Sequence, residues 1–363
     1  MVMATCSAGF LIDTLVAQIA EKGPIPVSSF MEQAARTYYA RGQAFGEKGD
    51  FTTAPEVCQV FGEIVGLWLG VVWQSMGSPA PMCLAELGPG RGTLMADILR
   101  VACRVPGFSA ALSVHLVEQS VALRQCQRQH IASVSSSLPV TWHSDLDTLP
   151  EHPILFVANE FFDALPIEQF EATENGWMRR YVQVGSDQGF EFVAQGLPIK
   201  MEGCNGPKGT IMETCPAAQD IVQSMARRIS RNGGGALIFD YGYEGDAYGD
   251  TLQAVRHHAY VSPLYAPGTV DLSAHVNFGL LGKAARVKGA CVWGPVEQGR
   301  FLARLGAEQR AKALIQNASE EQALALSSGV RRLIHPQEMG VLFKVLAISH
   351  DELPVPPGFE CFL

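Results

Sequence analysis

The chain has 363 residues, of which 47% are hydrophobic, and this is enough to bury the cores of about two domains. Its formal net charge of −9 argues against a general nucleic-acid-binding protein, because such proteins present a basic surface to the phosphates. The nine cysteines include no C-x-x-C pair and no zinc-ligand spacing, so we interpret them as thiols of a reducing compartment and expect no metal site.

The first 80 residues have the pattern of a helical lobe. One helix is expected to end at Gly23, and a second to begin at Ser29, which has capping-box spacing to the glutamate three residues later. The segment Thr53–Glu56 repeats that spacing before a long apolar helix that is expected to end near Gln74. We take residues 1–80 as an N-terminal helical lobe that packs on the rest of the chain.

From residue 82 onward, apolar runs of strand length alternate with amphipathic segments. Strands are expected over residues 82–85, 112–117, 139–142, 154–158 and 235–239, near 291, and over 341–348. Helices are expected over residues 94–99, 121–130 and 217–230, from 274, and within 301–327. This alternation is typical of an α/β fold with a mainly parallel sheet. We assign residues 81–363 to one Rossmann-like core, with an inserted hairpin at about 167–212 and irregular or helical segments at about 243–330.

A glycine turn joins the first of these strands to its helix. Gly88, Gly90 and Gly92 follow Glu86 with the spacing G-x-G-x-G, whereas the dinucleotide fingerprint is G-x-G-x-x-G. Alternate glycines let a ligand lie against bare backbone above a helix N-terminus. Glu86 closes the strand and favours a cationic ligand, and S-adenosylmethionine carries both a sulfonium and an ammonium group. The turn therefore predicts a methyltransferase-type site, with a dinucleotide site or a simple connecting turn as the alternatives.

Polar residues also follow the other predicted strands. Ligands of open parallel sheets bind outside the carboxyl ends of the strands, where these residues would gather. Glu118 ends the second strand, at the position where such sheets accept the ribose hydroxyls of a nucleotide. Asp145 follows the third strand and is expected to accept a hydrogen bond from an adenine amino group, or alternatively to cap a helix.

The segment after the fourth strand is the second informative stretch. Asn159 is expected beside the donor's sulfonium, and Glu160 and Asp163 flank a pair of phenylalanines. A guanidinium stacks on aromatic rings and forms paired hydrogen bonds with carboxylates, so this segment suits an arginine side chain. The alternative is that Phe161 and Phe162 pack in the core while the two acids cap the next helix.

Taken together, these residues resemble the MidA family of S-adenosylmethionine-dependent methyltransferases. The matching segments are residues 45–46, 49–56, 86–94, 159–166, 240–243, 271–276, 332–333 and 342–346. The chain departs from the family pattern at Cys58 and Ser273, where serine and threonine are expected. Neither departure changes a charged residue of the predicted site.

The resemblance implies a class I methyltransferase core of Rossmann-like fold with an added helical lobe, and S-adenosyl-L-methionine as cofactor. It also implies an arginine-bearing protein as substrate, since the mitochondrial members methylate a protein arginine and assist the assembly of respiratory complex I. A complex I subunit or its bacterial counterpart is the expected target. The N-terminus shows neither a signal peptide nor a mitochondrial presequence, so we expect a protein of the bacterial cytoplasm. The longest apolar run, Ile64 to Trp73, has about ten residues, too few to span a membrane.

Arginine is a poor nucleophile because its guanidinium holds its proton up to a pKa above about 12. Glu160 and Asp163 are expected to orient it, and His275 to accept the proton, unless His275 is a hydrogen-bonded structural histidine. The loop from Gly49 to Thr53 is expected to close over the donor and contact it through Thr52 and Thr53, or to be a static turn. Two other functions stay open: a methyltransferase of small molecules, and a donor-binding assembly factor with little catalysis. The sequence does not indicate an oligomeric state.

Overall fold

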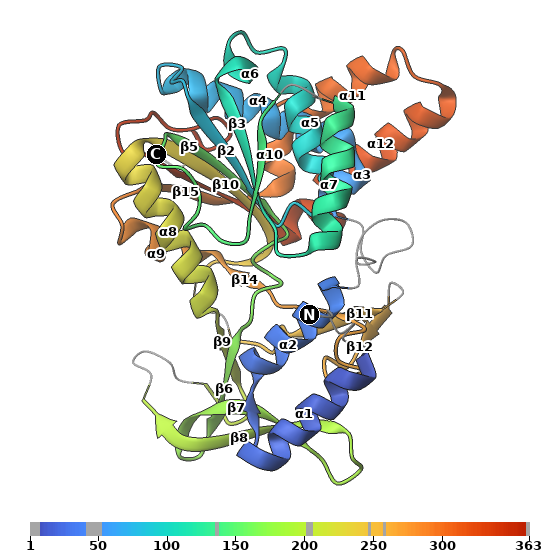
Figure 1. The fold of residues 1–363 in the computed structure, drawn as a ribbon, viewed down its shortest axis with the longest axis vertical. Coiled ribbons are helices and arrows are strands. Elements are labelled where there is room, and N and C mark those ends of the chain that lie inside the picture. The colour runs from blue at the N-terminus through green and yellow to red at the C-terminus, as the bar shows by residue number, and fades with distance from the viewer. Residues whose placement is uncertain are drawn as a thin grey trace, which may run out of the picture. The chain divides into compact units, whose positions relative to one another are not determined.

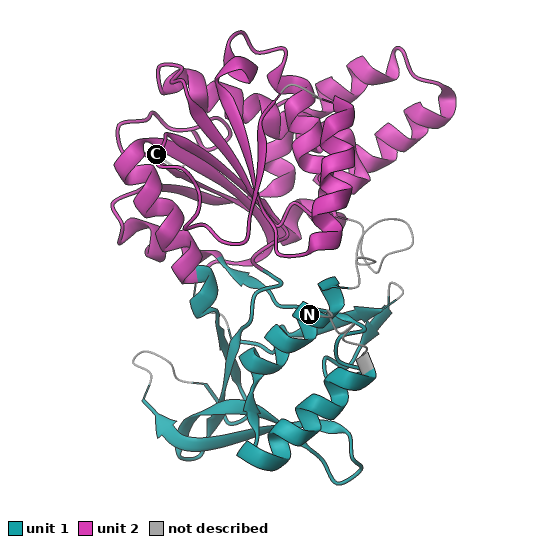
Figure 2. Cartoon of the chain, viewed as in Figure 1, with its two compact units in different colours: residues 1–51, 163–218, 245–277 teal, residues 52–162, 219–244, 278–363 magenta. Residues whose placement is uncertain are grey.

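The computed structural model describes residues 8–40, 53–134, 138–200, 206–245, 248–256 and 259–360. The chain forms two compact units, each built from segments that are far apart in the sequence (Figure 2). Unit 1 comprises residues 1–51, 163–218 and 245–277, and unit 2 comprises residues 52–162, 219–244 and 278–363. This division differs from the boundary expected near residue 80. The helices between residues 54 and 75 belong to unit 2, and the inserted hairpin belongs to the unit that holds the first two helices.

Unit 2 contains a mainly parallel sheet, which confirms the predicted α/β core (Figure 1). Its strands lie in the order β15-β16-β10-β5-β2-β3-β4. Their bounds are β2 Met82–Leu87, β3 Leu112–Val117, β4 Val140–His143, β5 Ile154–Asn159, β10 Gly234–Tyr243, β15 Cys291–Glu297 and β16 Phe343–Ser349. Strands β2, β3, β4, β5 and β10 pair in parallel, while β16 pairs antiparallel with both β10 and β15. The carboxyl ends of β2, β3, β4, β5 and β10 therefore lie at one edge of the sheet.

Helices flank this sheet. Those of unit 2 are α3 Ala54–Val57, α4 Gln59–Ser75, α5 Thr93–Ala102, α6 Phe108–Ala111, α7 Val121–Val134, α9 Phe278–Arg286, α10 Gln298–Arg304, α11 Ala307–Ile315, α12 Glu320–Ile334 and the π-helical turn η1 Pro336–Gly340. Helix α8, Pro216–Asn232, begins in unit 1 and continues into unit 2. Every residue of β2 and β5 is buried, as is usual for parallel strands that are covered on both faces. The ring of Phe61 on α4 packs edge-to-face on Phe239 of β10, with centroids 4.9 Å apart.

Unit 1 has two antiparallel sheets and two helices, α1 Ala8–Lys22 and α2 Val27–Ala40. One sheet has the order β1-β7-β6-β9, with β8 beside β7, and the other has the order β12-β11-β13. The bounds are β1 Ile25–Pro26, β6 Glu168–Thr173, β7 Gly176–Val184, β8 Phe190–Ile199, β9 Ile211–Thr214, β11 Gln253–Arg256, β12 Ala259–Val261 and β13 Asp271–Ser273. The short strand β14, Val276–Asn277, belongs to neither of these two sheets. The predicted hairpin is thus an antiparallel sheet, and its apolar residues share a core with Phe30 and Met31 of α2.

Two expected helices differ from those observed. The helix expected from residue 274 begins at Phe278, because the chain is still extended on either side of residue 274, in β13 (Asp271–Ser273) and β14 (Val276–Asn277). The helix expected after Thr53 is divided into α3 and α4 at Cys58, whose φ of −162° is extended.

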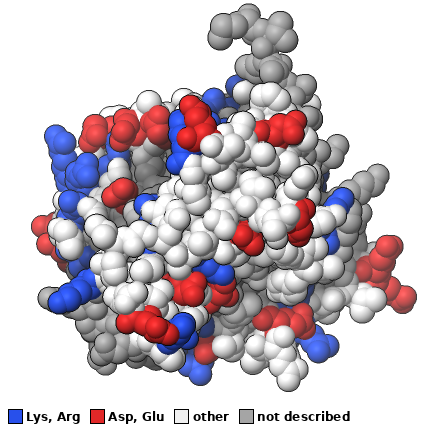
Figure 3. All heavy atoms as spheres, turned by 90° about the horizontal axis from the view of Figure 1, so that it is seen from below, with Lys and Arg blue, Asp and Glu red and all other residues white. Residues whose placement is uncertain are grey.

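Charged side chains of both signs are mixed on the face that Figure 3 shows, and no continuous basic surface covers this face. None of the helices in the described ranges has the length and hydropathy needed to span a bilayer. Within the same ranges, no cluster of three or more His, Cys, Asp or Glu side chains is arranged to hold a metal ion.

Candidate active site

The glycine turn between β2 and α5 has the conformation that its glycines permit. The φ angles of Gly88, Gly90 and Gly92 are 62°, 52° and 84°, in the left-handed region that glycine adopts at little cost. Neighbouring groups also press on the turn: a Cβ built on Gly88 would lie 2.7 Å from the ring of Phe161, and one on Gly92 would lie 3.3 Å from the Cα of Gln127. The turn leads directly into the N-terminus of α5 at Thr93.

Glu86 lies at the end of β2 and is only 3% exposed. Its Oε2 atom has no hydrogen-bond partner among the described residues. Burial, helped by the nearby charge of Glu118, raises the pKa of this carboxyl to about 8. A buried carboxyl with an unpaired oxygen beside a glycine turn suits a cationic ligand, which would stabilise the charged form. These residues therefore fit the ammonium or sulfonium group of S-adenosylmethionine.

Glu118 follows β3 and is held from both sides. Its Oε1 accepts a hydrogen bond from the backbone N–H of Ser120 at 2.7 Å, and its Oε2 accepts one from Nε2 of Gln127 at 3.2 Å. The carboxylate is half-buried, and burial raises its pKa. Each carboxylate oxygen has further lone pairs, so the group is able to accept hydrogen bonds from vicinal hydroxyls as well.

Asp145 lies in the turn after β4, on the surface. Its Oδ1 accepts hydrogen bonds from the backbone N–H groups of Asp147 at 3.0 Å and Thr148 at 3.3 Å. It therefore stabilises its own turn, and it does not cap a helix, because no helix lies between β4 and β5 in the described residues. The contact with adenine stays a prediction.

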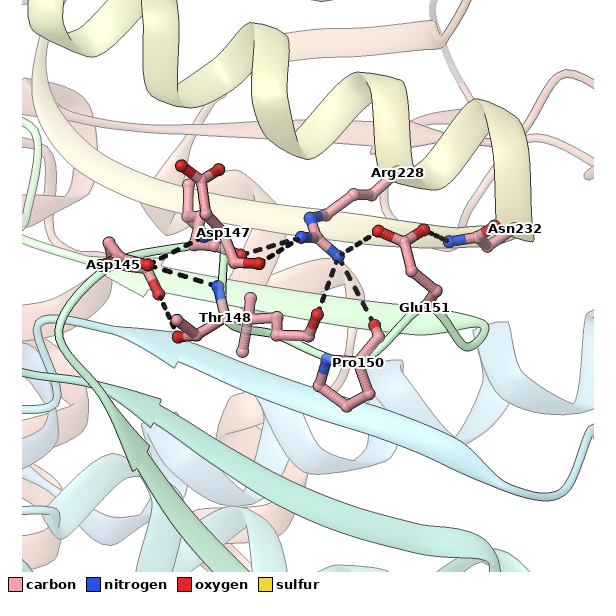
Figure 4. A network of polar contacts seen from close by, with 9 residues as sticks. Asp145, Asp147, Thr148, Pro150, Glu151, Arg228 and Asn232 are labelled. Carbon is pink, nitrogen blue, oxygen red and sulfur yellow. Dashed lines mark hydrogen bonds and ion pairs between the residues drawn. The ribbon is translucent and has the colours of Figure 1, made fainter.

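The turn around Asp145 is fixed from the other side by Arg228 of α8 (Figure 4). The guanidinium of this buried arginine points into the turn and donates to the backbone carbonyls of Leu146, Asp147, Leu149 and Pro150, at 3.0 to 3.5 Å. It also forms an ion pair with Glu151 at 3.3 Å. Because the carbonyls converge on one rigid group, the turn is held in a defined conformation next to the carboxyl end of β4.

Glu160 follows β5 in an unusual backbone conformation. Its φ of 49° lies in the left-handed region, which costs a non-glycine residue about 1 to 3 kcal/mol and is frequent at functional sites. Its Oε1 accepts hydrogen bonds from the backbone N–H of Ala54 at 2.9 Å and from Nδ2 of Asn159 at 3.2 Å. Its own backbone N–H donates to the carbonyl of Phe239 in β10 at 2.9 Å. These contacts hold the strained residue and its carboxylate in place.

The residues around Glu160 connect this segment to the glycine turn. Phe161 is half-buried, contacts Gly88 and packs edge-to-face on Phe162, with ring centroids 5.1 Å apart. Phe162 is buried in the core, and its N–H donates to Oδ2 of Asp240 at 2.9 Å. Oδ1 of Asn159 is buried without a partner in the described part of the chain. Of the two rings, only Phe161 is therefore presented beside the turn.

Helix α3 contacts both regions, Glu160 through the N–H of Ala54 and the glycine turn through the side chain of Glu56. Oε1 of this residue accepts a hydrogen bond from the hydroxyl of Thr93 at 2.5 Å, and Oε2 lies 3.7 Å from the guanidinium of Arg91. The predicted capping box at Thr53 is therefore absent, because the carboxylate of Glu56 faces the glycine turn instead, and Thr53 forms no side-chain cap. The sequence pattern predicted only a capping role for Glu56. Thr52 lies outside the described residues.

The other two predicted catalytic residues, Asp163 and His275, belong to unit 1. The carbonyl of Asp163 accepts the N–H of Ala274, and the N–H of His275 donates to the hydroxyl of Thr251 at 2.9 Å. Burial lowers the pKa of His275, so its imidazole is neutral near pH 7 and able to accept a proton. Asp163 is a buried residue, with 9% of its surface exposed.

Tyr39 and Asp271 belong to the same part of unit 1. The hydroxyl of Tyr39 donates to Oδ1 of Asp271 at 3.0 Å. Burial, followed by the charges of Asp271 and Asp163, raises the pKa of Tyr39 well above its usual value. Asp163 therefore lies near a second carboxylate, Asp271, within unit 1. The sequence pattern did not indicate Tyr39 as a residue of this cluster.

Residues 64–296 match a family model described as "Putative S-adenosyl-L-methionine-dependent methyltransferase". The chain is 38% identical over 369 residues to the mitochondrial protein arginine methyltransferase NDUFAF7 of Mus musculus, with 93% of this chain and 84% of the relative covered. It is 36% identical over 374 residues to the homologue of Drosophila melanogaster, with 94% and 85% covered. A crystal structure of a Burkholderia thailandensis protein bound to S-adenosyl-homocysteine superposes with a TM-score of 0.83 at 25% identity, covering 99% of this chain and 96% of that one.

Proposed function

Because the chain belongs to this family of S-adenosyl-L-methionine-dependent methyltransferases, we propose that its methyl acceptor is an arginine side chain of a protein. The mouse and Drosophila relatives are both named protein arginine methyltransferases. The observation that carries the proposal is Glu160, whose strained backbone and two accepted hydrogen bonds at Oε1 fix a carboxylate on the residue that precedes the half-buried Phe161. A carboxylate beside an aromatic face is the environment that a guanidinium prefers.

The donor site proposed here follows from the strand ends. We assign the donor contacts to Glu86, Gly88, Gly90, Gly92, Glu118, Asp145, Asn159 and Thr53, together with Thr52, which lies outside the described residues. The unpaired oxygens of Glu86 and Asn159 supply acceptors for the cationic part of the donor. Glu118 supplies acceptors for its ribose hydroxyls.

The bound cofactor supplies a methyl group that its sulfonium has already activated, so the protein mainly orients the acceptor and excludes water. In this proposal Glu160 and Asp163 bind the guanidinium and turn one nitrogen toward the methyl carbon. With the cofactor bound, that nitrogen would take the methyl group while the electrons of the carbon–sulfur bond stay with the sulfur, and one proton would leave the nitrogen. His275 accepts that proton, since its lowered pKa keeps it neutral beforehand.

The finer identity of the substrate follows from the family resemblance. We propose a subunit of respiratory complex I, or its bacterial counterpart, as the methylated protein, and the bacterial cytoplasm as the location. The eukaryotic relatives are named mitochondrial.

A labelled-methyl transfer assay tests the acceptor. Purified protein, bacterial lysate and S-adenosylmethionine with an isotopically labelled methyl group are incubated, and the products are analysed by mass spectrometry. We expect the label on arginine residues of a protein. Label only in small molecules would support a small-molecule methyltransferase instead. Cofactor binding without label transfer would support an assembly factor with little catalysis.

A further inference from the structure

Gln127 is fully buried on α7, although glutamine is usually found on protein surfaces. Its Nε2 donates to the carbonyl of Gly90 at 2.8 Å and to Oε2 of Glu118 at 3.2 Å. Its Oε1 accepts a hydrogen bond from the indole N–H of Trp142 at 2.8 Å. One side-chain amide therefore connects the glycine turn, the end of β3 and the strand β4.

The surrounding packing leaves this amide little freedom. The Cα of Gln127 would lie 3.3 Å from a Cβ on Gly92, so the helix backbone rests directly on the turn. Arg128, the next residue on α7, stacks over the ring of Trp142 at 4.7 Å. The position of the amide is therefore fixed by the helix on one side and by the indole on the other.

We propose that Gln127 is a positioning residue for donor binding, which sets the distance between the glycine turn and the carboxylate of Glu118 so that both contact one ligand. The proposal rests on the donor site assigned above. Neither of the two groups is able to hold the other directly, because a carbonyl and a carboxylate are both acceptors. Gln127 supplies the two N–H donors that both of them need.

The chemistry of the amide explains why other residues would fail there. Methionine has nearly the same length but no donors, so the carbonyl of Gly90 and one oxygen of Glu118 would lose a partner. Glutamate would keep an acceptor for Trp142, but it would place a second carboxylate next to Glu118 in a buried site. In both variants the spacing of the two donor contacts would no longer be fixed.

Isothermal titration with S-adenosylhomocysteine tests the proposal. We expect Gln127→Met to weaken binding about tenfold to a hundredfold, as the loss of a hydrogen bond to a charged group costs about 1.5 to 3 kcal/mol. Gln129→Met is the matched control, since Gln129 is an exposed glutamine on the same helix, and its affinity should equal that of the wild type. Thermal unfolding of each variant without ligand separates loss of fold from loss of binding.

A second ligand makes the test specific to positioning. The 2′-deoxy analogue of S-adenosylhomocysteine lacks a ribose hydroxyl from which Glu118 would accept a hydrogen bond. We expect the wild type and Gln129→Met to prefer the natural ligand, and Gln127→Met to lose most of that preference. Trp142→Phe, which removes the indole N–H that Gln127 accepts and keeps a smaller aromatic ring, should give a smaller loss of preference and serves if Gln127→Met does not fold.

These measurements distinguish the positioning role of Gln127 from the existence of the donor site. If the wild type binds S-adenosylhomocysteine and both Gln127→Met and Trp142→Phe keep its affinity and its preference for the ribose hydroxyl, the positioning role is wrong. If the wild type does not bind S-adenosylhomocysteine at all, the donor site itself is wrong, and the role of Gln127 falls with it.

Discussion

The glycine turn after β2 and the segment after β5 lie at the ends of neighbouring parallel strands, yet they reach their conformations by different means. The turn has left-handed backbone at three glycines, where it costs little. Glu160 adopts left-handed backbone as a residue with a full side chain, and hydrogen bonds to Ala54, Asn159 and Phe239 hold it there. The conformation of the glycine turn follows from its local sequence, whereas that of Glu160 depends on hydrogen bonds to other segments of the chain.

This difference suggests a division of work. In the proposed donor site, the turn of glycines provides backbone and space for the donor, and Glu86 and Glu118 provide the charged contacts. The segment after β5 instead presents a held carboxylate and an aromatic ring, which are the groups that an acceptor would meet. Variants in each region will show whether donor binding and methyl transfer depend on the two regions separately or together.

The largest effect is expected from Gly90→Val in the turn. A β-branched side chain is strongly disfavoured at a φ of 52°, so the turn would change its conformation and the donor would lose its backbone contacts. We expect S-adenosylhomocysteine binding to fall below detection in isothermal titration while the far-UV circular dichroism stays native. Gly77→Val is the matched control. Gly77 also has a left-handed φ, of 81°, but it follows α4 in the same unit, and a Cβ there would meet no atom within 4 Å. Unaltered binding by Gly90→Val would refute the donor assignment.

A smaller effect is expected from Glu56→Ala, because Glu56 contacts the turn while the adjacent Ala54 contacts Glu160. The variant leaves the hydroxyl of Thr93 and the guanidinium of Arg91 without their carboxylate. We expect donor affinity and transfer rate each to fall about fivefold to tenfold, in line with about 1 kcal/mol for one hydrogen bond.

The change at Thr93 provides the complementary comparison. Thr93→Val removes the hydroxyl and should reproduce part of the loss, whereas Thr93→Ser keeps the hydroxyl and should restore it. If Glu56→Ala alters only one of the two measurements, helix α3 does not couple the regions.

An effect of similar size is a pH dependence of donor binding that we expect from Glu86. Its pKa of about 8 in the free protein means that most molecules carry a neutral carboxyl at pH 7 and a charged one at pH 9. A cationic ligand binds the charged form, so affinity for S-adenosylmethionine should rise by up to about tenfold from pH 7 to pH 9. Titrations in buffers of different ionisation enthalpy should show proton release on binding. Glu86→Gln should remove both effects, and an unchanged profile in that variant would exclude Glu86 as their source.

Much of the fold was predictable because its signals are local. The buried strands β2, β5 and β10 are continuous apolar runs, and each ends in the acidic or amide residues that the sequence pattern indicated. The family resemblance was confirmed by the comparisons. The glycine turn was visible because its residues are adjacent in sequence.

The remaining features depend on contacts between distant residues. Glu56 meets Thr93, and Gln127 meets Gly90, each across 37 positions of sequence, and neither pair has a pattern that marks it. The predicted capping box at Thr53 is absent for the same reason, since the carboxylate of Glu56 faces the glycine turn. Unit 1 joins three separate segments, so no change of composition along the chain could reveal its limits.

The most direct test of the proposed arginine site is Glu160→Gln, measured in parallel for donor binding and for methyl transfer to protein arginine. The amide keeps the shape of the side chain but lacks the charge that holds a guanidinium, and Glu352→Gln, an exposed glutamate of unit 2, is the control. We predict an unchanged affinity for S-adenosylhomocysteine and a transfer rate reduced at least about a hundredfold. Transfer to arginine at the wild-type rate, in a variant that binds the donor normally, would contradict the role assigned to Glu160.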